Sequence, residues 1–254
     1  MATAEDTIPQ KVRLDVLLCE SGRFETRARA RDAVVRGTVE VDGTVCKKPG
    51  IRLSRDAAIR ITDPADGYVS RAALKLITGL EHFGFDPAGR NALDIGASTG
   101  GFSQVLLERG AAHVTAIDVG HGQLHPSLAS DERVSNLEGI NARHLTRETV
   151  GDRPAEAVVS DVSFISLKLA LPPALAMAEP GSFCVLLVKP QFEAGKGALG
   201  KGGILRDPEL ANHIAEDLSA WLDAQPGWKS LGTCPSPISG GDGNREFLLG
   251  GLRA

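Results

Sequence analysis

The chain has 254 residues, of which 42% are hydrophobic and 24% are charged, so the composition excludes disordered and fibrous proteins. The longest apolar run, Phe183–Val188, is far shorter than the roughly 18 residues of a membrane-spanning helix. The first residues lack the pattern of a secretion signal, and the four cysteines form no C-x-x-C motif. We therefore expect a cytoplasmic protein without disulfides and without a metal site.

Charge is distributed unevenly along the chain. Residues 1–60 contain 12 Lys/Arg and 9 Asp/Glu, whereas residues 61–254 contain 16 and 23. A basic segment ahead of an acidic body favours contact with a polyanion such as a nucleic acid. The alternative is that charged residues are distributed unevenly over the surface without any binding role. Charge alone does not distinguish the two interpretations.

The first part of the chain has the pattern of a small α+β domain. Leucines at helical spacing predict a helix over Arg13–Ser21, and Thr26 and Gly37 bound a second helix over Arg27–Arg36. An Asp-Gly turn predicts a β-hairpin, which a last short strand follows: Thr38–Val41, Thr44–Cys46 and Ala58–Thr62. This domain covers residues 1–62, and a turn-rich linker covers 63–69.

Residues 70–254 form the second predicted domain, in which strands alternate with helices. The predicted strands are Ala92–Ile95, Val114–Asp118, Val134–Leu137, Ala157–Ser160, Ser182–Val188 and Phe247–Gly250. The predicted helices are Ser70–Phe83, one from Gly100, Ser166–Ala178 and Pro208–Leu222. This alternation predicts a mainly parallel α/β sheet of the Rossmann type.

Basic residues of the N-terminal domain predict contacts with RNA phosphates, with a solvated helix face as the alternative. They are Arg13, Arg27, Arg31, Lys47 and Lys48. The surrounding pattern resembles the S4 RNA-binding domain: Arg13-Leu14-Asp15, Thr26-Arg27-x-x-Ala30, Val34-x-x-Gly37-x-Val39-x-Val41-x-Gly43 and Lys48-Pro49-Gly50. The resemblance implies that this domain grips structured RNA by its shape and phosphates.

The segment Asp94–Phe102 (DIGASTGGF) follows a predicted strand and opens a helix, as in a ligand-binding loop. Its glycine spacing differs from the G-x-G-x-x-G motif of NAD sites, and Asp94 would repel a pyrophosphate. S-adenosylmethionine, with a cationic amino acid end, suits the loop better, and Asp118 can bind its ribose. A turn without any ligand is the remaining alternative. The expected binding residues are Asp94, Gly96, Ala97, Ser98, Thr99, Gly100, Gly101, Phe102, Asp118 and Val119.

Six segments together resemble the TlyA family, which joins an S4 domain to an FtsJ/RrmJ-like ribose 2′-O-methyltransferase and is often labelled hemolysin. They are Tyr68–Leu76, Leu93–Phe102, Ala116–Leu124, Ser160–Lys168, Leu187–Gly195 and Ser236–Leu248. One departure is Ala72-Ala73, where this family usually has Gly-Gly. The resemblance implies a Lys-Asp-Lys-Glu catalytic set, formed by Lys75, Asp161, Lys189 and Glu246. It also implies cytidine in ribosomal RNA as the target, and we expect a monomeric enzyme.

The positions of two of these residues support the set independently. Asp161 and Lys189 follow predicted parallel strands, at the edge of the sheet where ligands bind. We expect Lys189 to take the proton of the ribose hydroxyl and Lys75 to steady the oxygen. Asp161 and Glu246 would orient the two lysines. Ordinary surface ion pairs are the alternative for each residue taken alone.

Several weaker signals point elsewhere. His121 and His125 have the spacing of metal ligands on one helix, but no third ligand is evident. Cys234 lies too close to the end of the chain for a cytosine-C5 nucleophile, and Asp161–Phe164 differs from the motif of base-amine methyltransferases. The glycine-rich loop Gly195–Gly203 is expected to be mobile, and Glu193, Lys196 and Lys201 are candidates for contact with RNA.

Two alternative functions are a pore-forming protein and a non-catalytic RNA-binding factor. The sequence lacks the amphipathic membrane anchor that the first would need, and the second would not need Asp94 or Asp118.

Overall fold

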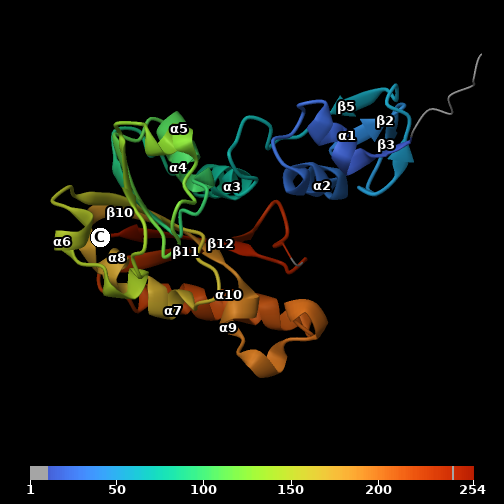
Figure 1. Ribbon diagram of the computed structural model, residues 1–254. Helices are drawn as coiled ribbons and strands as arrows, with labels where there is room; N and C mark the ends of the chain where they lie inside the picture. The colour runs from blue at the N-terminus through green and yellow to red at the C-terminus, as the bar shows by residue number, and fades with distance from the viewer. Residues whose placement is uncertain (1–10, 242) are drawn as a thin grey trace, which may run out of the picture. The chain divides into compact units, whose positions relative to one another are not determined.

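The computed structural model describes residues 11–241 and 243–254 (Figure 1). The chain divides into two compact units between Asp66 and Gly67. Within the described ranges, no helix is both long enough and apolar enough to cross a membrane.

From residue 11 on, where its description begins, the smaller unit contains two helices and two small antiparallel sheets. The helices are α1 (Leu14–Glu20) and α2 (Arg27–Arg36), as the sequence predicts. The order of the larger sheet is β3 (Thr44–Val45), β2 (Val39–Val41), β5 (Ile59–Ile61). The pair β1 (Val12–Arg13) and β4 (Arg52–Leu53) was not predicted, because two residues are too few to show an alternating pattern.

Local sequence signals set the turns of this unit. The Arg29 main-chain N–H donates to the Thr26 hydroxyl and caps α2, and Gly37 ends the helix with φ +78°. Asp42 and Gly43 both have positive φ, as the hairpin turn requires. The core that these turns enclose is formed by Leu14, Leu18, Ala30, Ala33, Val34 and Val39.

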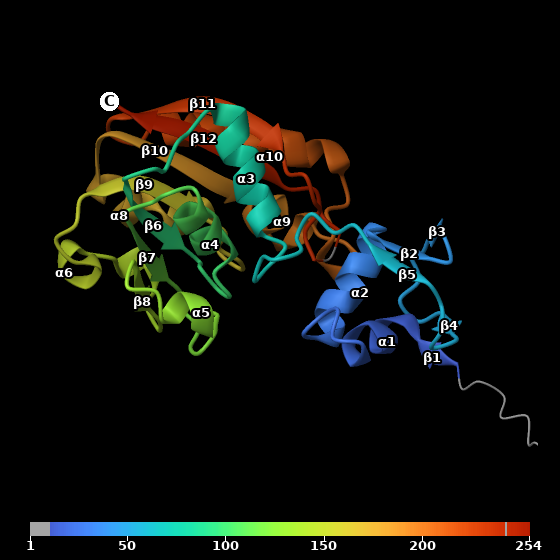
Figure 2. The ribbon, with the colours of Figure 1, turned by 90° about the horizontal axis from the view of Figure 1, so that it is seen from above.

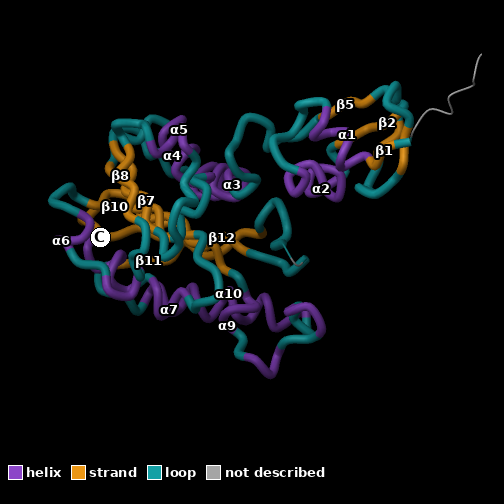
Figure 3. The backbone as a smooth tube through the Cα atoms, viewed as in Figure 1, coloured by secondary structure: helices purple, strands orange, loops and turns teal. Residues whose placement is uncertain are grey.

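The larger unit is built on a seven-stranded sheet with the order β11-β12-β10-β9-β6-β7-β8 (Figure 3). The five strands β6 (Asn91–Ile95), β7 (His113–Ile117), β8 (Val134–Leu137), β9 (Ala155–Ser160) and β10 (Ala178–Val188) are parallel. The antiparallel strand β12 (Phe247–Arg253) joins them to β11 (Trp228–Pro235). The predicted Rossmann-type α/β class is therefore confirmed.

The sequence analysis missed the edge strand β11. Its sequence, WKSLGTCP, contains Gly232 and ends in proline, and both residues are disfavoured inside strands. The register also shifts between Ser230 and Gly232, which breaks the alternation of apolar residues. Only the partner strand β12 shows that this segment extends the sheet.

Helices cover both faces of the sheet, and side chains alternate between them along each strand. Leu186 and Val188 pack with α7 (Leu167–Ala170), α8 (Pro172–Met177) and α10 (Pro208–Asp223). Val185 and Leu187 pack on the opposite face with α3 (Ala73–Phe83), α4 (Gly101–Glu108) and α5 (Pro126–Ala129). Figure 2 looks onto the face that carries α3 and α4. Both faces of the parallel strands are thus buried, as expected for such a sheet.

The single helix predicted over Ser166–Ala178 is wrong, since two short helices, α7 and α8, occupy this segment. Pro172 and Pro173 lack the N–H groups that would continue the first helix, whereas proline is tolerated in the first turn of a new one. The remaining helical segments are short: α6 (Arg147–Val150), α9 (Pro190–Glu193) and 3-10 turns at Ala142–His144, Lys196–Ala198 and Lys201–Gly203.

Candidate active site

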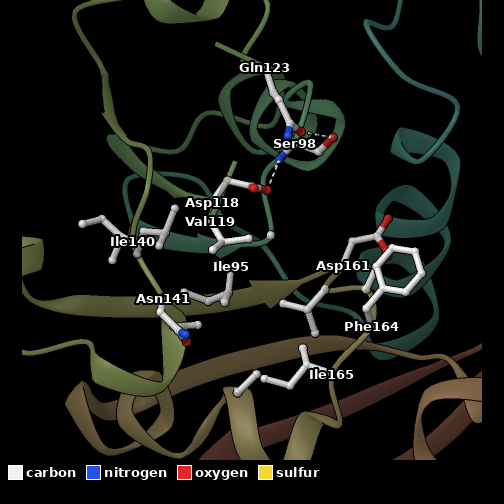
Figure 4. Close-up of a pocket in the computed structure, with 16 residues that line it drawn as sticks. Ile95, Ser98, Asp118, Val119, Gln123, Ile140, Asn141, Asp161, Phe164 and Ile165 are labelled. Atoms are coloured by element: carbon white, nitrogen blue, oxygen red, sulfur yellow. Dashed lines mark hydrogen bonds between the residues drawn. The ribbon is translucent and has the colours of Figure 1, made fainter. Parts of the chain in front are cut away.

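Two cavities of the larger unit adjoin each other at the carboxyl ends of the parallel strands, where such sheets bind ligands. Figure 4 shows the larger of the two. The larger has a volume of about 440 Å³ and the smaller about 140 Å³. Both are lined by Gly96, Ser98, Asp161 and Ser163. A molecule bound in the larger cavity would therefore meet one bound in the smaller.

The loop between β6 and α4 forms the wall common to both cavities. Gly96 has φ +84°, and a Cβ there would lie 3.0 Å from the main chain of Val162, so only glycine fits without displacing that segment. Ser98 also has positive φ, which is uncommon for a residue with a side chain. Of the other predicted loop residues, Ala97, Thr99, Gly101 and Phe102 line the smaller cavity, whereas Gly100 caps α4.

Asp118 follows β7 and connects this loop to the larger cavity. Its carboxylate accepts a hydrogen bond from the main-chain N–H group of Ser98 at 2.8 Å (Figure 4) and another from that of Gly120 at 2.7 Å. A carboxylate has further lone pairs, which can accept hydrogen bonds from ribose hydroxyls. Val119 lines the same cavity and is 68% exposed.

The remaining wall of the larger cavity is mostly apolar. Figure 4 shows Ile95, Ile140 and Ile165 around it, with Asn141 and Gln123 as polar neighbours. Apolar walls with a few polar groups suit a flat heterocycle joined to a sugar.

Asp94, at the start of the predicted loop, is the fourth residue of β6. Its side chain is completely buried and is absent from the lining of both cavities. One carboxyl oxygen accepts a hydrogen bond from the Ser103 hydroxyl at 2.7 Å, and burial raises the pKa of Asp94 to about 7. Asp94 therefore fastens α4 to β6. Among the described residues its other carboxyl oxygen has no hydrogen-bond partner, and the expected contact with a ligand stays a prediction.

The four residues of the expected catalytic set come together beside the smaller cavity. Lys189 Nζ lies 2.5 Å from Asp161 Oδ1, and Lys75 Nζ lies 2.7 Å from Glu246 Oε2. Lys75 Nζ is also 3.8 Å from Asp161 Oδ2, so Asp161 joins the two pairs. Two lysines and two carboxyl groups face one another in this network, and of the four only Asp161 is more than a tenth exposed. Such a network fixes each side chain in one position.

Four separate elements supply this set. Lys75 lies in α3, Asp161 follows β9, Lys189 follows β10, and Glu246 precedes β12. A Cβ at Gly240 would lie 2.7 Å from Glu246 Oε1, so this glycine leaves room for the carboxylate.

Two residues of the site carry no signal in the sequence that would mark them. Ser163 Oγ accepts a hydrogen bond from Lys189 Nζ at 2.7 Å. Phe164 has φ +64° and is 90% exposed at the larger cavity, with its ring 5.0 Å from that of Phe192. Positive φ at a bulky residue is a strained conformation that often accompanies function. Backbone strain and a surface serine are both invisible in a single sequence.

Asn244 holds the glycine-rich loop beside the catalytic set. Its side chain is 3% exposed, accepts a hydrogen bond from Leu205 N at 3.1 Å and donates one to Gly203 O at 3.0 Å. Lys201 is exposed on this loop, and the side chain of Lys196 lies outside what the structure describes. Glu193 accepts from the Ser166 hydroxyl and from Leu167 N, and so caps α7.

In the smaller unit, two of the predicted RNA contacts share one buried carboxylate. Arg13 and Arg27 contact Asp15 at 2.9 and 3.0 Å, and hydrogen bonds from Arg13 and then Arg27 lower the pKa of Asp15 to about 2. Arg31, Lys47 and Lys48 are exposed. Asp15 thus holds two guanidinium groups in fixed positions at the surface.

The weaker signals have structural roles. His125 caps α5 through its Nδ1 atom, and the part of the chain that the structure describes contains no group of three or more side chains suited to a metal ion. Cys234 is buried in β11, where burial raises the pKa of its thiol.

This fold and this site are those of a methyltransferase. A model of FtsJ-like methyltransferases matches residues 68–253, and a model of the S4 domain matches residues 12–59. The chain belongs to the FtsJ-like methyltransferase family, as its sequence motifs predicted.

Its similarity to TlyA proteins extends over both units. The chain is 46% identical to the 16S/23S rRNA (cytidine-2′-O)-methyltransferase TlyA of Mycobacterium tuberculosis, covering 94% of this chain and 89% of that protein. It is 39% identical to Hemolysin A of Brachyspira hyodysenteriae, covering 93% and 98%. A solved structure of a hemolysin candidate from Streptococcus thermophilus superposes with a TM-score of 0.74 at 38% identity, covering 97% and 90%.

Proposed function

We propose that the protein transfers a methyl group from S-adenosylmethionine to the ribose 2′-hydroxyl of a cytidine in ribosomal RNA. The observation that carries this proposal is the contact of Lys189 with Asp161 at the smaller cavity. It provides an amine that can serve as a base for a hydroxyl group bound in that cavity. The printed names of the TlyA relatives support ribosomal RNA and cytidine as the target.

The residues of the larger cavity fit S-adenosylmethionine. The Asp118 carboxylate can accept hydrogen bonds from the ribose hydroxyls, and the isoleucines can pack against the adenine ring. Asp161 lines both cavities and offers a carboxylate to a cation. When bound, S-adenosylmethionine supplies the methyl group: its sulfur–methyl bond breaks, with the electron pair remaining on sulfur, as the bond from methyl carbon to 2′-oxygen forms.

The protein's own residues position the hydroxyl and remove its proton. Lys189 accepts the proton of the 2′-hydroxyl as a general base. Lys75, held by Glu246, steadies the developing negative charge on the oxygen. Asp161 keeps Lys189 in place and balances its charge after proton transfer. Most of the rate enhancement then comes from orientation of the two reactants.

The S4 unit supplies affinity for the RNA in this proposal. Arg13 and Arg27, fixed by Asp15, and the exposed residues Lys47 and Lys48 offer positive charge to phosphates. Ribosomal RNA as the substrate places the proposed activity in the cytoplasm. The relatives' names give two possible targets, 16S/23S and 23S ribosomal RNA, and the experiment below distinguishes them.

The test is transfer of tritium from labelled S-adenosylmethionine to separated 30S and 50S subunits and to naked rRNA. We expect label in an alkali-resistant dinucleotide, because a 2′-O-methyl group blocks alkaline cleavage. Lys189→Ala should abolish the transfer and leave S-adenosylmethionine affinity within a few-fold of wild type. Absence of label on every RNA, with S-adenosylmethionine still bound, would refute ribosomal RNA as the substrate.

A further inference from the structure

The amino group of Lys189 has two close hydrogen-bond acceptors in the structure. Nζ lies 2.5 Å from Asp161 Oδ1 and 2.7 Å from Ser163 Oγ. The main-chain oxygen of Asp161, at 3.4 Å, is beyond the usual range for an N–H···O hydrogen bond. Ser163, like Asp161 and Lys189, lines the smaller cavity.

We propose that Ser163 is a positioning residue that, with Asp161, aims the Lys189 amine at the target hydroxyl. The proposal rests on the function proposed above. A neutral amine has two N–H bonds and one lone pair in tetrahedral directions. When Asp161 and Ser163 accept the two protons, the lone pair takes the one direction that remains, and in this proposal that direction meets a hydroxyl group placed in the smaller cavity, which Lys189 lines. With Asp161 alone, rotation about the Cε–Nζ bond would spread the lone pair over several directions.

The main chain around Ser163 is held in a way that preserves this geometry. The Asp161 N–H donates to Ile95 O at 3.1 Å, which keeps the start of the segment on the edge of β6. Phe164 then adopts φ +64°, a conformation that bulky residues rarely take. Ser163 therefore lies between two constrained residues, and its hydroxyl group meets a lysine that is only 9% exposed.

Ser163 is neither consumed nor charged during the reaction. The O–H bond of the ribose breaks, and its proton forms a third N–H bond on Lys189 Nζ. The resulting ammonium group has three protons, two of which already have acceptors in Asp161 and Ser163. The Asp161 carboxylate balances the new positive charge.

The test compares Ser163→Ala and Ser163→Thr with wild type in single-turnover methyl transfer to ribosomal subunits. Ser163→Ala should lower the rate about 10- to 100-fold, a part of what general-base catalysis contributes. The Kd for S-adenosylmethionine and the half-saturating RNA concentration should stay within about two-fold, because the hydroxyl group is engaged by Lys189 even though Ser163 also lines the larger cavity. Ser163→Thr keeps the hydroxyl and should restore the rate to within about three-fold. Ser130→Ala, an exposed serine outside both cavities, is the matched control.

Two results would overturn the proposal. A Ser163→Ala rate within about two-fold of wild type would show that Asp161 alone orients the amine. A loss of S-adenosylmethionine affinity as large as the loss of rate would instead make Ser163 a ligand of the methyl donor. Failure of the proposed function is distinguishable, because wild type would then label no ribosomal RNA at all.

Discussion

The buried carboxyl group of Asp94 predicts a pH dependence of stability that one substitution removes. Burial raises its pKa from 3.8 to about 7, so the folded protein keeps a proton that the unfolded chain loses above about pH 4. The contribution of this proton to stability is complete at low pH and is lost as the pH rises towards 7. In full, it changes the free energy of unfolding by about 4 kcal/mol.

The assay is urea unfolding of the whole chain at about pH 5 and pH 8.5, between which this contribution changes by about 2.5 kcal/mol. Both tryptophans lie in the larger unit, so their fluorescence reports on the unit that contains Asp94. The wild type loses this contribution when the pH rises from 5 to 8.5, whereas Asp94→Asn has none to lose. The free energy of unfolding of Asp94→Asn should therefore rise by about 2.5 kcal/mol relative to that of the wild type. Asp86→Asn, at an exposed position, controls for removal of one carboxylate. A difference between Asp94→Asn and wild type that stays constant within about 0.5 kcal/mol would refute the reasoning.

Three further substitutions test the site. Glu246→Gln should lower the free energy of unfolding by about 3 kcal/mol, because it leaves the buried Lys75 ammonium without its nearest counter-charge; a loss below about 1 kcal/mol in urea unfolding would contradict this. Asn244→Ala removes the side-chain hydrogen bonds to Gly203 of the glycine-rich loop and to Leu205 just after it, so trypsin should cleave after Lys201 several-fold faster; an unchanged rate would argue against this clamp. Asp118→Ala should raise the S-adenosylmethionine Kd about 10- to 100-fold, as calorimetry can measure; an unchanged Kd would exclude the ribose contact.

Periodic and local signals in the sequence predicted much of the fold correctly. The alternation of strands and helices predicted the parallel sheet, because a helix usually connects two parallel strands. Continuous apolar runs marked the strands, because both faces of such a sheet are buried. The helix predicted over Arg27–Arg36 has the bounds of α2, since a threonine cap and a glycine stop act within a few residues. Asp161 and Lys189 were placed at one edge of the sheet for a similar reason: each directly follows a strand.

Side-chain direction and contacts between distant segments required the tertiary structure. Asp94 matches the binding motif, yet alternation along β6 turns it towards the face covered by α4. The strand β11 has too weak a pattern of its own and is defined by its pairing with β12.

By itself, the sequence determined the class of fold and the motifs of the loop, because these depend on short-range patterns and on spacing. The four charged residues of the expected catalytic set were predicted from the family resemblance. Only the tertiary structure decided that Lys75 pairs with Glu246, that Asp161 connects both lysines, and that Ser163 contacts Lys189. Those contacts join segments far apart in the chain, and their distances follow from how helices pack on the sheet rather than from any local preference.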